Sequence, residues 1–266
     1  MSCRSIAMTE KFQERAAVVR QEAIGNGIYS LYLKTGSVAA HAVPGQFVSL
    51  YCADKSRLLP RPISICRTDP ENGVIRLVYR LAGEGTKEFS GLQPGDSVDI
   101  IGPLGNGYPL SKGGRGRSAL LIGGGIGIPP LLELAAQLEG KREIVLGFRS
   151  EQFLTEEFKS YGSVYIATED GSFGTRGNVL DAVNAHRLTA DVIYACGPMV
   201  MLHFVRQFAI RHGIPCYLSL EERMACGVGA CLGCVCKTVK KDAHSQVNNA
   251  RVCTEGPVFN ALDVEI

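Results

Sequence analysis

The sequence predicts a chain in three parts: an antiparallel β-barrel, an α/β domain on a doubly wound parallel sheet, and a small cysteine-rich C-terminal unit. Short alternating strands separated by glycine and proline fill residues 12–110, which favours a small barrel. Strand-like and helix-like segments then alternate up to residue 220, which favours a parallel sheet. A run of closely spaced cysteines follows. We expect the domains to span residues 1–113, 114–220 and 221–266.

The barrel prediction depends on four segments in which apolar and polar residues alternate or follow a turn. They are Ile28–Leu33, Gln46–Tyr51, Val74–Arg80 and Ser97–Ile101. One short helix, Thr86–Leu92, is expected between the last two. The polar, glycine-rich stretch Ser111–Arg117 is typical of an exposed loop or a domain boundary.

The α/β prediction depends on five apolar strand segments, four of which are followed by a helical pattern. The strands are expected at residues 119–122, 144–148, 164–167, 191–195 and 216–220. The helices are expected at residues 130–138, 155–161, 179–187 and 199–212.

The composition limits the classes of function. A length of 266 residues with 45% hydrophobic residues is enough for two domains and an appendage. A net charge of +2 without basic runs argues against nucleic-acid binding. The longest uncharged stretch, 118–132, is too short for a membrane span and contains glycine and proline. Ten cysteines without an apolar leader at the N-terminus favour a reducing cytoplasm, where thiols are kept for a metal.

The cysteine run is the most specific motif. Cys226, Cys231, Cys234 and Cys253 have the spacing C-x4-C-x2-C…C, which is the plant-type pattern for a [2Fe–2S] cluster. The glycines between them allow tight turns that point amide N–H groups at the cluster sulfurs. A zinc site with four thiolates is the main alternative, although zinc sites usually pair their cysteines in two short knuckles. Cys236 is a fifth candidate that the spacing does not exclude.

Two loops of the α/β domain have features of a dinucleotide site. The glycines Gly123, Gly124, Gly125 and Gly127 connect the first strand to a helix, where a diphosphate can approach the backbone. Their spacing differs from the G-x-G-x-x-G fingerprint, so a tight strand–helix turn remains the alternative. Cys196-Gly197 follows the fourth strand, and its small side chain suits a surface against a flat nicotinamide. A buried structural cysteine is the alternative there.

Three short segments of the barrel have features of a flavin site. An arginine can neutralise a phosphate, a serine can hydrogen-bond a ring nitrogen, and a helix start can hold a phosphate. Each segment alone is more typical of a strand edge or a cap than of a flavin site, and the combination is much more specific. The segments are Arg61-Pro62-Ile63-Ser64, Val78-Tyr79-Arg80 and Gly85-Thr86.

Together these motifs resemble the ferredoxin–NADP reductase superfamily. The ending Glu221–Cys236 with Val252–Phe259 more closely resembles the electron-transfer subunits of class B dihydroorotate dehydrogenases, and the resemblance covers nearly the whole chain. A related family, the small subunits of NADPH-dependent ferredoxin or sulfide oxidoreductases, typically has a Gly-Thr-Gly-Met-Cys-Gly cluster loop, which this chain does not match.

The resemblance implies the roles of these residues. The three barrel segments would contact FAD, the four cysteines of the plant-type pattern would hold the cluster, and Cys236 would hold nothing. The glycine loop and Cys196-Gly197 would face NAD, and Ser64 and Cys196 are the candidate catalytic residues. Arg149 and Ser150 could receive the 2′-phosphate of NADP or could be ordinary loop residues, so the residues themselves leave NAD and NADP open.

The resemblance also implies a partner and a path for electrons. NAD⁺ accepts a hydride and a [2Fe–2S] cluster carries one electron, so a flavin, which handles both, must stand between them. A partner subunit with FMN would oxidise dihydroorotate in pyrimidine biosynthesis. Its electrons would pass through the cluster and FAD to NAD⁺, in a heterotetramer of two chains of each kind. The alternatives are a free-standing NAD(P)H reductase that serves a ferredoxin or an oxygenase, and a non-redox binding module stabilised by zinc.

Overall fold

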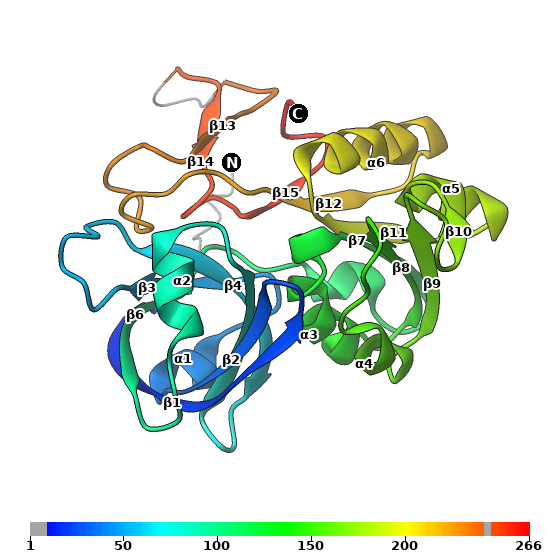
Figure 1. Ribbon diagram of the computed structural model, residues 1–266. Coiled ribbons are helices and arrows are strands. Elements are labelled where there is room, and N and C mark those ends of the chain that lie inside the picture. The colour runs from blue at the N-terminus through cyan, green and yellow to red at the C-terminus, as the bar shows by residue number, and fades with distance from the viewer. Residues whose placement is uncertain (1–9, 242–245) are drawn as a thin grey trace.

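The computed structural model describes residues 10–241 and 246–266 and confirms the predicted fold class (Figure 1). The first unit is a closed barrel with strand order β1-β2-β5-β4-β3-β6. All its neighbouring strands pair antiparallel. Its strands are β1 (Phe12–Gly25), β2 (Ile28–Lys34), β3 (Phe47–Tyr51), β4 (Arg61–Asp69), β5 (Val74–Arg80) and β6 (Ser97–Leu104).

Apolar side chains at alternate positions fill the barrel interior. Leu31 and Leu33 on β2, Leu50 on β3, and Ile75 and Leu77 on β5 are all inaccessible to solvent. Two short helices complete the unit: α1 (Ser37–His41), which the sequence analysis did not predict, and α2 (Glu84–Ser90), which begins two residues before the predicted helix.

The second unit is a sheet with strand order β10-β9-β8-β7-β11-β12-β15, covered by helices (Figure 1). Its parallel strands are β7 (Ser118–Gly124), β8 (Lys141–Phe148), β9 (Ser163–Thr168), β10 (Thr175–Arg176), β11 (Val192–Cys196) and β12 (Cys216–Ser219). The helices are α3 (Pro130–Gln137), α4 (Thr155–Lys159), α5 (Val179–Ala185) and α6 (Met199–His212). All five predicted strands and four predicted helices are present.

The strand order reverses between β7 and β11. From β7 the chain proceeds outward through β8 and β9 on one side, and β11 continues to β12 on the other. Sheets of this kind bind ligands outside the carboxyl ends of their strands, where the strand order reverses. Gly123 and Gly124 end β7, Gly125 and Gly127 follow it, and Cys196 ends β11, so both predicted segments lie at this position.

The C-terminal unit packs against both larger units. A hairpin of β13 (Val235–Lys237) and β14 (Asn249–Arg251) stands apart, but β15 (Val258–Asn260) pairs antiparallel with β12 and extends the large sheet (Figure 1). Cys234 and Cys253 share a buried apolar cluster with Phe47 of the barrel and Leu218 of the sheet. No helix within residues 10–241 and 246–266 is long and apolar enough to cross a membrane.

Two partly buried ion pairs connect the barrel to the α/β unit. Glu133 on α3 is buried and accepts a hydrogen bond of 2.8 Å from the Thr68 backbone N–H on β4. The same carboxylate oxygen lies 3.5 Å from Arg67 Nε. On the neighbouring strand, Arg76 Nη1 lies 2.6 Å from Glu157 on α4. These contacts fix how the two units face each other.

Candidate functional site

The structure brings together two of the predicted flavin segments that are far apart in sequence. Arg61 begins β4, and its guanidinium lies over Gly85 at the start of α2. A Cβ added to Gly85 would lie 2.2 Å from Arg61 Nε, so only glycine permits this approach. The guanidinium also donates to the Leu59 carbonyl. Arg61 is thus held in place beside the first turn of α2.

Thr86 stabilises that turn. Its hydroxyl accepts hydrogen bonds from the backbone N–H groups of Ala82 at 2.9 Å and Gly83 at 3.2 Å, and it donates to the Gly83 carbonyl at 2.9 Å. The hydroxyl therefore shapes the loop before α2. Thr86 supports the predicted phosphate site through this loop.

Of the three residues predicted on β5 to contact a flavin, one points into the barrel core and two point outward. Tyr79 is 1% exposed, its ring packs in the barrel core, and its hydroxyl donates to Gln21 Oε1 at 3.2 Å. Val78 instead packs in the apolar cluster shared with the α/β unit, and Arg80 is exposed. Because side chains alternate across a strand, Val78 and Arg80 face outward, and Tyr79 can offer a cofactor only its backbone.

The β4 segment runs beside β3 at the same side of the barrel. Pro62 pairs with Ser49, Ile63 with Val48, and Ser64 with Phe47. Ser64 and Phe47 face the same side by the period of the strand, outside the barrel core. Ser64 is partly exposed there.

The two predicted nicotinamide loops touch each other. Cys196 lies beside Gly123 in the parallel register of β11 and β7. A Cβ added to Gly127 would lie 2.5 Å from the Cys196 carbonyl carbon and from Gly197 Cα. Only a glycine at 127 lets the loop and the turn pack this closely. The 3-10 turn Gly125–Gly127 also contacts β5, so the glycine loop faces the barrel strand that carries Val78.

The Cys196 thiol is neutral at physiological pH. Burial raises its pKa to about 12, against a hydrogen bond with Ser219 that lowers it. Ser219 also hydrogen-bonds the Tyr108 hydroxyl, which burial keeps protonated by raising its pKa well above the usual value. A neutral thiol is neither a base nor a nucleophile. Cys196 is therefore suited to contact and orient a ring.

Backbone amides converge on the first predicted cluster ligand. The N–H groups of Ala230 and Cys231 donate to Cys226 Sγ at 3.3 and 3.4 Å. Burial alone would raise the pKa of Cys226, but these two amides and the Val228 N–H lower it to about 6. Gly227 and Gly229 have φ of 68° and 89°, left-handed values that glycine adopts most readily. The loop thus favours a thiolate.

The four predicted ligands come in two adjacent pairs. Cys226 hydrogen-bonds with Cys231, and Cys234 hydrogen-bonds with Cys253. Cys253 also interacts electrostatically with Cys226 of the other pair. Within the part of the chain that the structure describes, no three His, Cys, Asp or Glu side chains are arranged to hold a metal ion. The donor chemistry, four neighbouring thiols and amides directed at sulfur, nevertheless fits a thiolate-bound cluster.

Cys236 differs from these four. It lies on β13 opposite Ala250, is buried, and has a pKa raised to about 11 by that burial.

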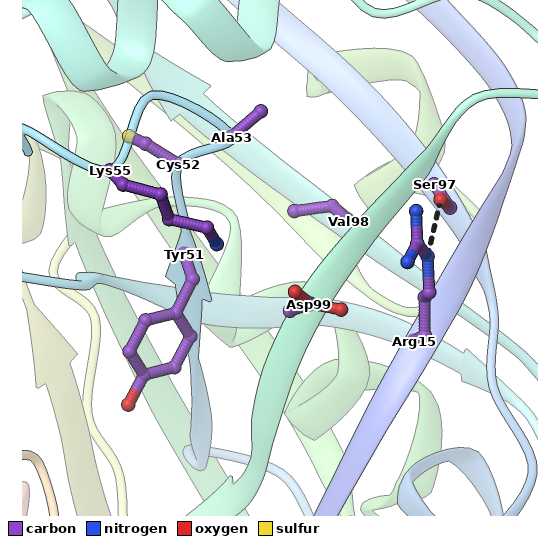
Figure 2. A pocket seen from close by; sticks show the side chains of 8 residues that line it. All are labelled: Arg15, Tyr51, Cys52, Ala53, Lys55, Ser97, Val98 and Asp99. Atoms are coloured by element: carbon purple, nitrogen blue, oxygen red, sulfur yellow. Dashed lines mark hydrogen bonds between the residues drawn. The ribbon is translucent and has the colours of Figure 1, made fainter.

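A hollow of about 220 Å³ lies elsewhere on the barrel surface (Figure 2). Arg15 of β1, Tyr51 of β3 and Asp99 of β6 line it, with the loop from Cys52 to Lys55. No predicted site residue lines it. It therefore does not bear on the flavin or nicotinamide assignments.

Sequence reasoning missed several residues that support the site. Ser219 hydrogen-bonds the Cys196 thiol and also the Tyr108 hydroxyl, and Gly85 was assigned to a phosphate cradle although the structure also uses it to admit Arg61. No motif marks Ser219 or Tyr108. Ser219 could have been found only from the pairing of β11 with β12, which places it beside Cys196.

Two family models match the chain. An oxidoreductase FAD-binding domain matches residues 15–108, and the iron–sulfur cluster binding domain of dihydroorotate dehydrogenase B matches residues 221–265.

Curated relatives match almost end to end. The dihydroorotate dehydrogenase B (NAD(+)) electron transfer subunit of Geobacillus sp. strain WCH70 is 45% identical, over 95% of this chain and 98% of its own. That of Bacillus caldolyticus is 46% identical with the same coverage, and that of Listeria monocytogenes serotype 4b is 44% identical over 96% and 99%.

Solved structures share the fold. A chain of the NADH-dependent reduced ferredoxin–NADP oxidoreductase superposes with a TM-score of 0.84 at 29% identity, over 94% of this chain and 89% of that one. The ferredoxin reductase of carbazole 1,9a-dioxygenase gives 0.64 at 22% identity, over 77% and 67%. The second likeness concerns the fold alone.

Proposed function

The chain belongs to the family of dihydroorotate dehydrogenase B electron transfer subunits, and we propose that it carries electrons from a catalytic partner subunit containing FMN to NAD⁺. The single observation behind this proposal is that one chain holds all three predicted sites together. When bound, a [2Fe–2S] cluster carries single electrons and FAD exchanges both single electrons and a hydride, so the pair connects a one-electron donor to NAD⁺.

The barrel would hold FAD between Arg61 and α2. A guanidinium fixed over Gly85 can form charge-assisted hydrogen bonds to a diphosphate. Ser64 lies three residues further along β4 and can hydrogen-bond the ring system. Val78 and Arg80, on the neighbouring strand β5, face outward from the barrel as Ser64 does. These residues bind and orient the flavin.

The α/β unit would hold NAD between the glycine loop and Cys196. The loop backbone is open to a diphosphate at the point where the strand order reverses. The neutral Cys196 thiol, held by Ser219, gives the nicotinamide a soft, uncharged surface. Glu133 and Glu157 keep this unit against the barrel, so that the two rings meet in one orientation.

We propose that the cluster-binding loop, residues 226–234, is also the surface that contacts the partner subunit. Cys231 is exposed, and the apolar side chain next to it, Leu232, is 64% exposed. Val228 on the same loop and Val235 at the start of β13 are 39% and 37% exposed. Exposed apolar residues beside a redox centre are suited to contact an electron donor. We further propose a heterotetramer of two chains of each kind, in agreement with the family resemblance.

A cytoplasmic location and the three-domain division complete the proposal. All nine described cysteines are free thiols, which fits a reducing compartment. The boundaries 1–113, 114–220 and 221–266 follow the change from barrel to sheet and from sheet to cysteine loop, although β15 returns to the sheet.

The test is the division of labour between the subunits. The chain alone should oxidise NADH with an artificial dye, because both nicotinamide and flavin segments are present. It should oxidise dihydroorotate only with its partner. Removal of the cluster should spare the NADH–dye reaction and abolish dihydroorotate-dependent reduction of NAD⁺ by the complex. A cluster-free complex with the normal rate of NAD⁺ reduction would refute the proposal.

A free-standing reductase and a zinc module make different predictions. The first would purify without a catalytic partner and would keep full activity with a ferredoxin. The second would be colourless, because zinc thiolates do not absorb visible light and a flavin and an iron–sulfur cluster do.

A further inference from the structure

Two hydroxyl groups at the cluster-binding loop are buried without a hydrogen-bond partner. Among the described residues that are not exposed, Ser49 and Thr254 are the side chains whose sole polar atom is buried and unpaired. Other side chains have one unpaired buried atom but bind through another: Arg67 to Glu133, Arg142 to Ala135 and Glu143 to Lys141. An unpaired buried hydroxyl is costly, so its presence in a native fold calls for an explanation.

Ser49 approaches the loop from the barrel. It lies in the middle of β3 and is 1% exposed. Its neighbours Val48 and Leu50 point into the barrel core, whereas Phe47 packs with Cys234 and Cys253. By the period of the strand, Ser49 faces the cluster-binding unit together with Phe47.

The cluster-binding loop covers the Ser49 hydroxyl directly. A Cβ added to Gly227, the residue after Cys226, would lie 2.8 Å from Ser49 Oγ. Ser49 also pairs with Pro62 of the flavin segment, so it stands between β4 and the cluster loop.

Thr254 approaches the same loop from the other side. It follows Cys253 directly, and its Oγ1 is buried although the residue is partly exposed. A Cβ added to Gly229 would lie 2.7 Å from Thr254 Cγ2 and 3.5 Å from Oγ1. Ser49 Oγ therefore lies beside Gly227, and the Thr254 side chain lies beside Gly229, the two glycines of the run between Cys226 and Cys231.

The reduction potential of an iron–sulfur cluster depends on hydrogen bonds to its sulfurs, and a donor favours the reduced state because that state carries more negative charge. We propose that the hydroxyls of Ser49 and Thr254 donate hydrogen bonds to the sulfurs of the cluster bound by this loop, and thereby raise its reduction potential. They are positioning residues and not ligands. The inference rests on the proposed function, because it requires the cluster.

The test uses the full chain co-expressed with its partner subunit and compares Ser49→Ala, Thr254→Val and wild type. The cluster potential is measured by redox titration followed by EPR, after iron, sulfide and FAD have been counted. Each variant should reduce the equilibrium constant for cluster reduction by about tenfold, which is about 59 mV for one electron. Thr254→Ser, which keeps the hydroxyl, should restore the wild-type value.

The matched control is Ser30→Ala. Ser30 is equally buried in the barrel, but its hydroxyl accepts a hydrogen bond of 2.8 Å from Arg76 at the other interface. The Ser30→Ala variant should leave the reduction potential of the cluster unchanged. Should Ser49→Ala not fold, Ser49→Cys retains a weaker donor of similar size and should give a smaller shift in the same direction.

The outcomes separate the two levels of the argument. A wild-type chain without iron and sulfide would refute the proposed function. Cluster-loaded Ser49→Ala and Thr254→Val proteins with the wild-type potential and EPR signal would overturn the inference alone.

Discussion

Replacement of Glu133 by alanine should destabilise the contact between the barrel and the α/β unit by about 3 kcal/mol. The Glu133 side chain is 6% exposed. It accepts hydrogen bonds from the Thr68 N–H at 2.8 Å and from Gln137 Nε2 at 2.7 Å. It also lies 3.5 Å from Arg67 Nε. A hydrogen bond to a charged group contributes about 1.5–3 kcal/mol, and breaking a buried ion pair costs about 3–5 kcal/mol. We take the lower end because Arg67 is 32% exposed.

Urea unfolding of the FAD-loaded chain measures this change as a lower midpoint at an unchanged slope. Glu133→Gln keeps an acceptor for Thr68 but loses the charge, so it should cost about half as much as alanine. The control is Glu156→Ala, whose side chain is 82% exposed and pairs only with Lys159 three residues away. It should cost at most about 0.5 kcal/mol. Equal midpoints for Glu133→Ala and Glu156→Ala would refute the reasoning.

Four further predictions concern the proposed sites. Cys253→Ser should lose the cluster while Cys236→Ser keeps it, as measured by iron content and the EPR signal of the reduced protein; loss in Cys236→Ser would contradict the ligand assignment. Arg61→Ala should raise the FAD dissociation constant by about tenfold or more, because it loses a charge-assisted hydrogen bond, and unchanged flavin retention in equilibrium dialysis would count against Arg61. Gly127→Ala should raise the KM for NADH by about tenfold, because its Cβ would lie 2.5 Å from Gly197 Cα and separate the two loops; FAD content serves as the control. Because burial raises the pKa of Cys196 to about 12, the thiol stays neutral below that pH, and Cys196→Ser should change the NADH–dye rate without moving its pH profile between about pH 6 and 9.

Local patterns in the sequence were sufficient for the α/β unit and most of the barrel. The predicted helix over residues 199–212 coincides with α6, because its apolar residues recur at helical spacing and Gly213 ends it in the left-handed conformation. The strands β1 and β4 were not predicted. In β1, the apolar residues Ala17, Val19 and Ala23 are exposed while Glu14 and Glu22 are half-buried, so no regular alternation of apolar and polar residues marks the strand. In β4, Pro62 lacks an N–H and is unfavourable in a strand interior, yet it pairs with Ser49.

The parts of the candidate site that a local sequence motif marks could be predicted. The contacts between segments that are distant in sequence could not. The cysteine spacing predicted an iron–sulfur unit in the segment that the cluster-binding family model matches, and the glycine loop was placed correctly at the end of the first parallel strand. The approach of Arg61 to Gly85, the network of Cys196, Ser219 and Tyr108, and the burial of Ser49 under Gly227 all join segments distant in sequence. Such contacts follow from strand pairing, which one sequence does not specify.

The packing of the cluster-binding unit explains why its position is fixed. The unit spans about 45 residues in the family match, which is too few for a substantial core of its own. Its buried residues Cys234, Val252 and Cys253 share one apolar cluster with Phe47 and Leu104 of the barrel. Its strand β15 hydrogen-bonds to β12 of the sheet, and Asn106 donates to the Thr254 carbonyl at 3.1 Å. A unit tied to both neighbours cannot shift against either one without losing buried apolar contacts or strand pairing. Since electron transfer requires a short and constant separation between centres, the same contacts that stabilise the cysteine loop also hold it close to β4, the strand with the predicted flavin segment.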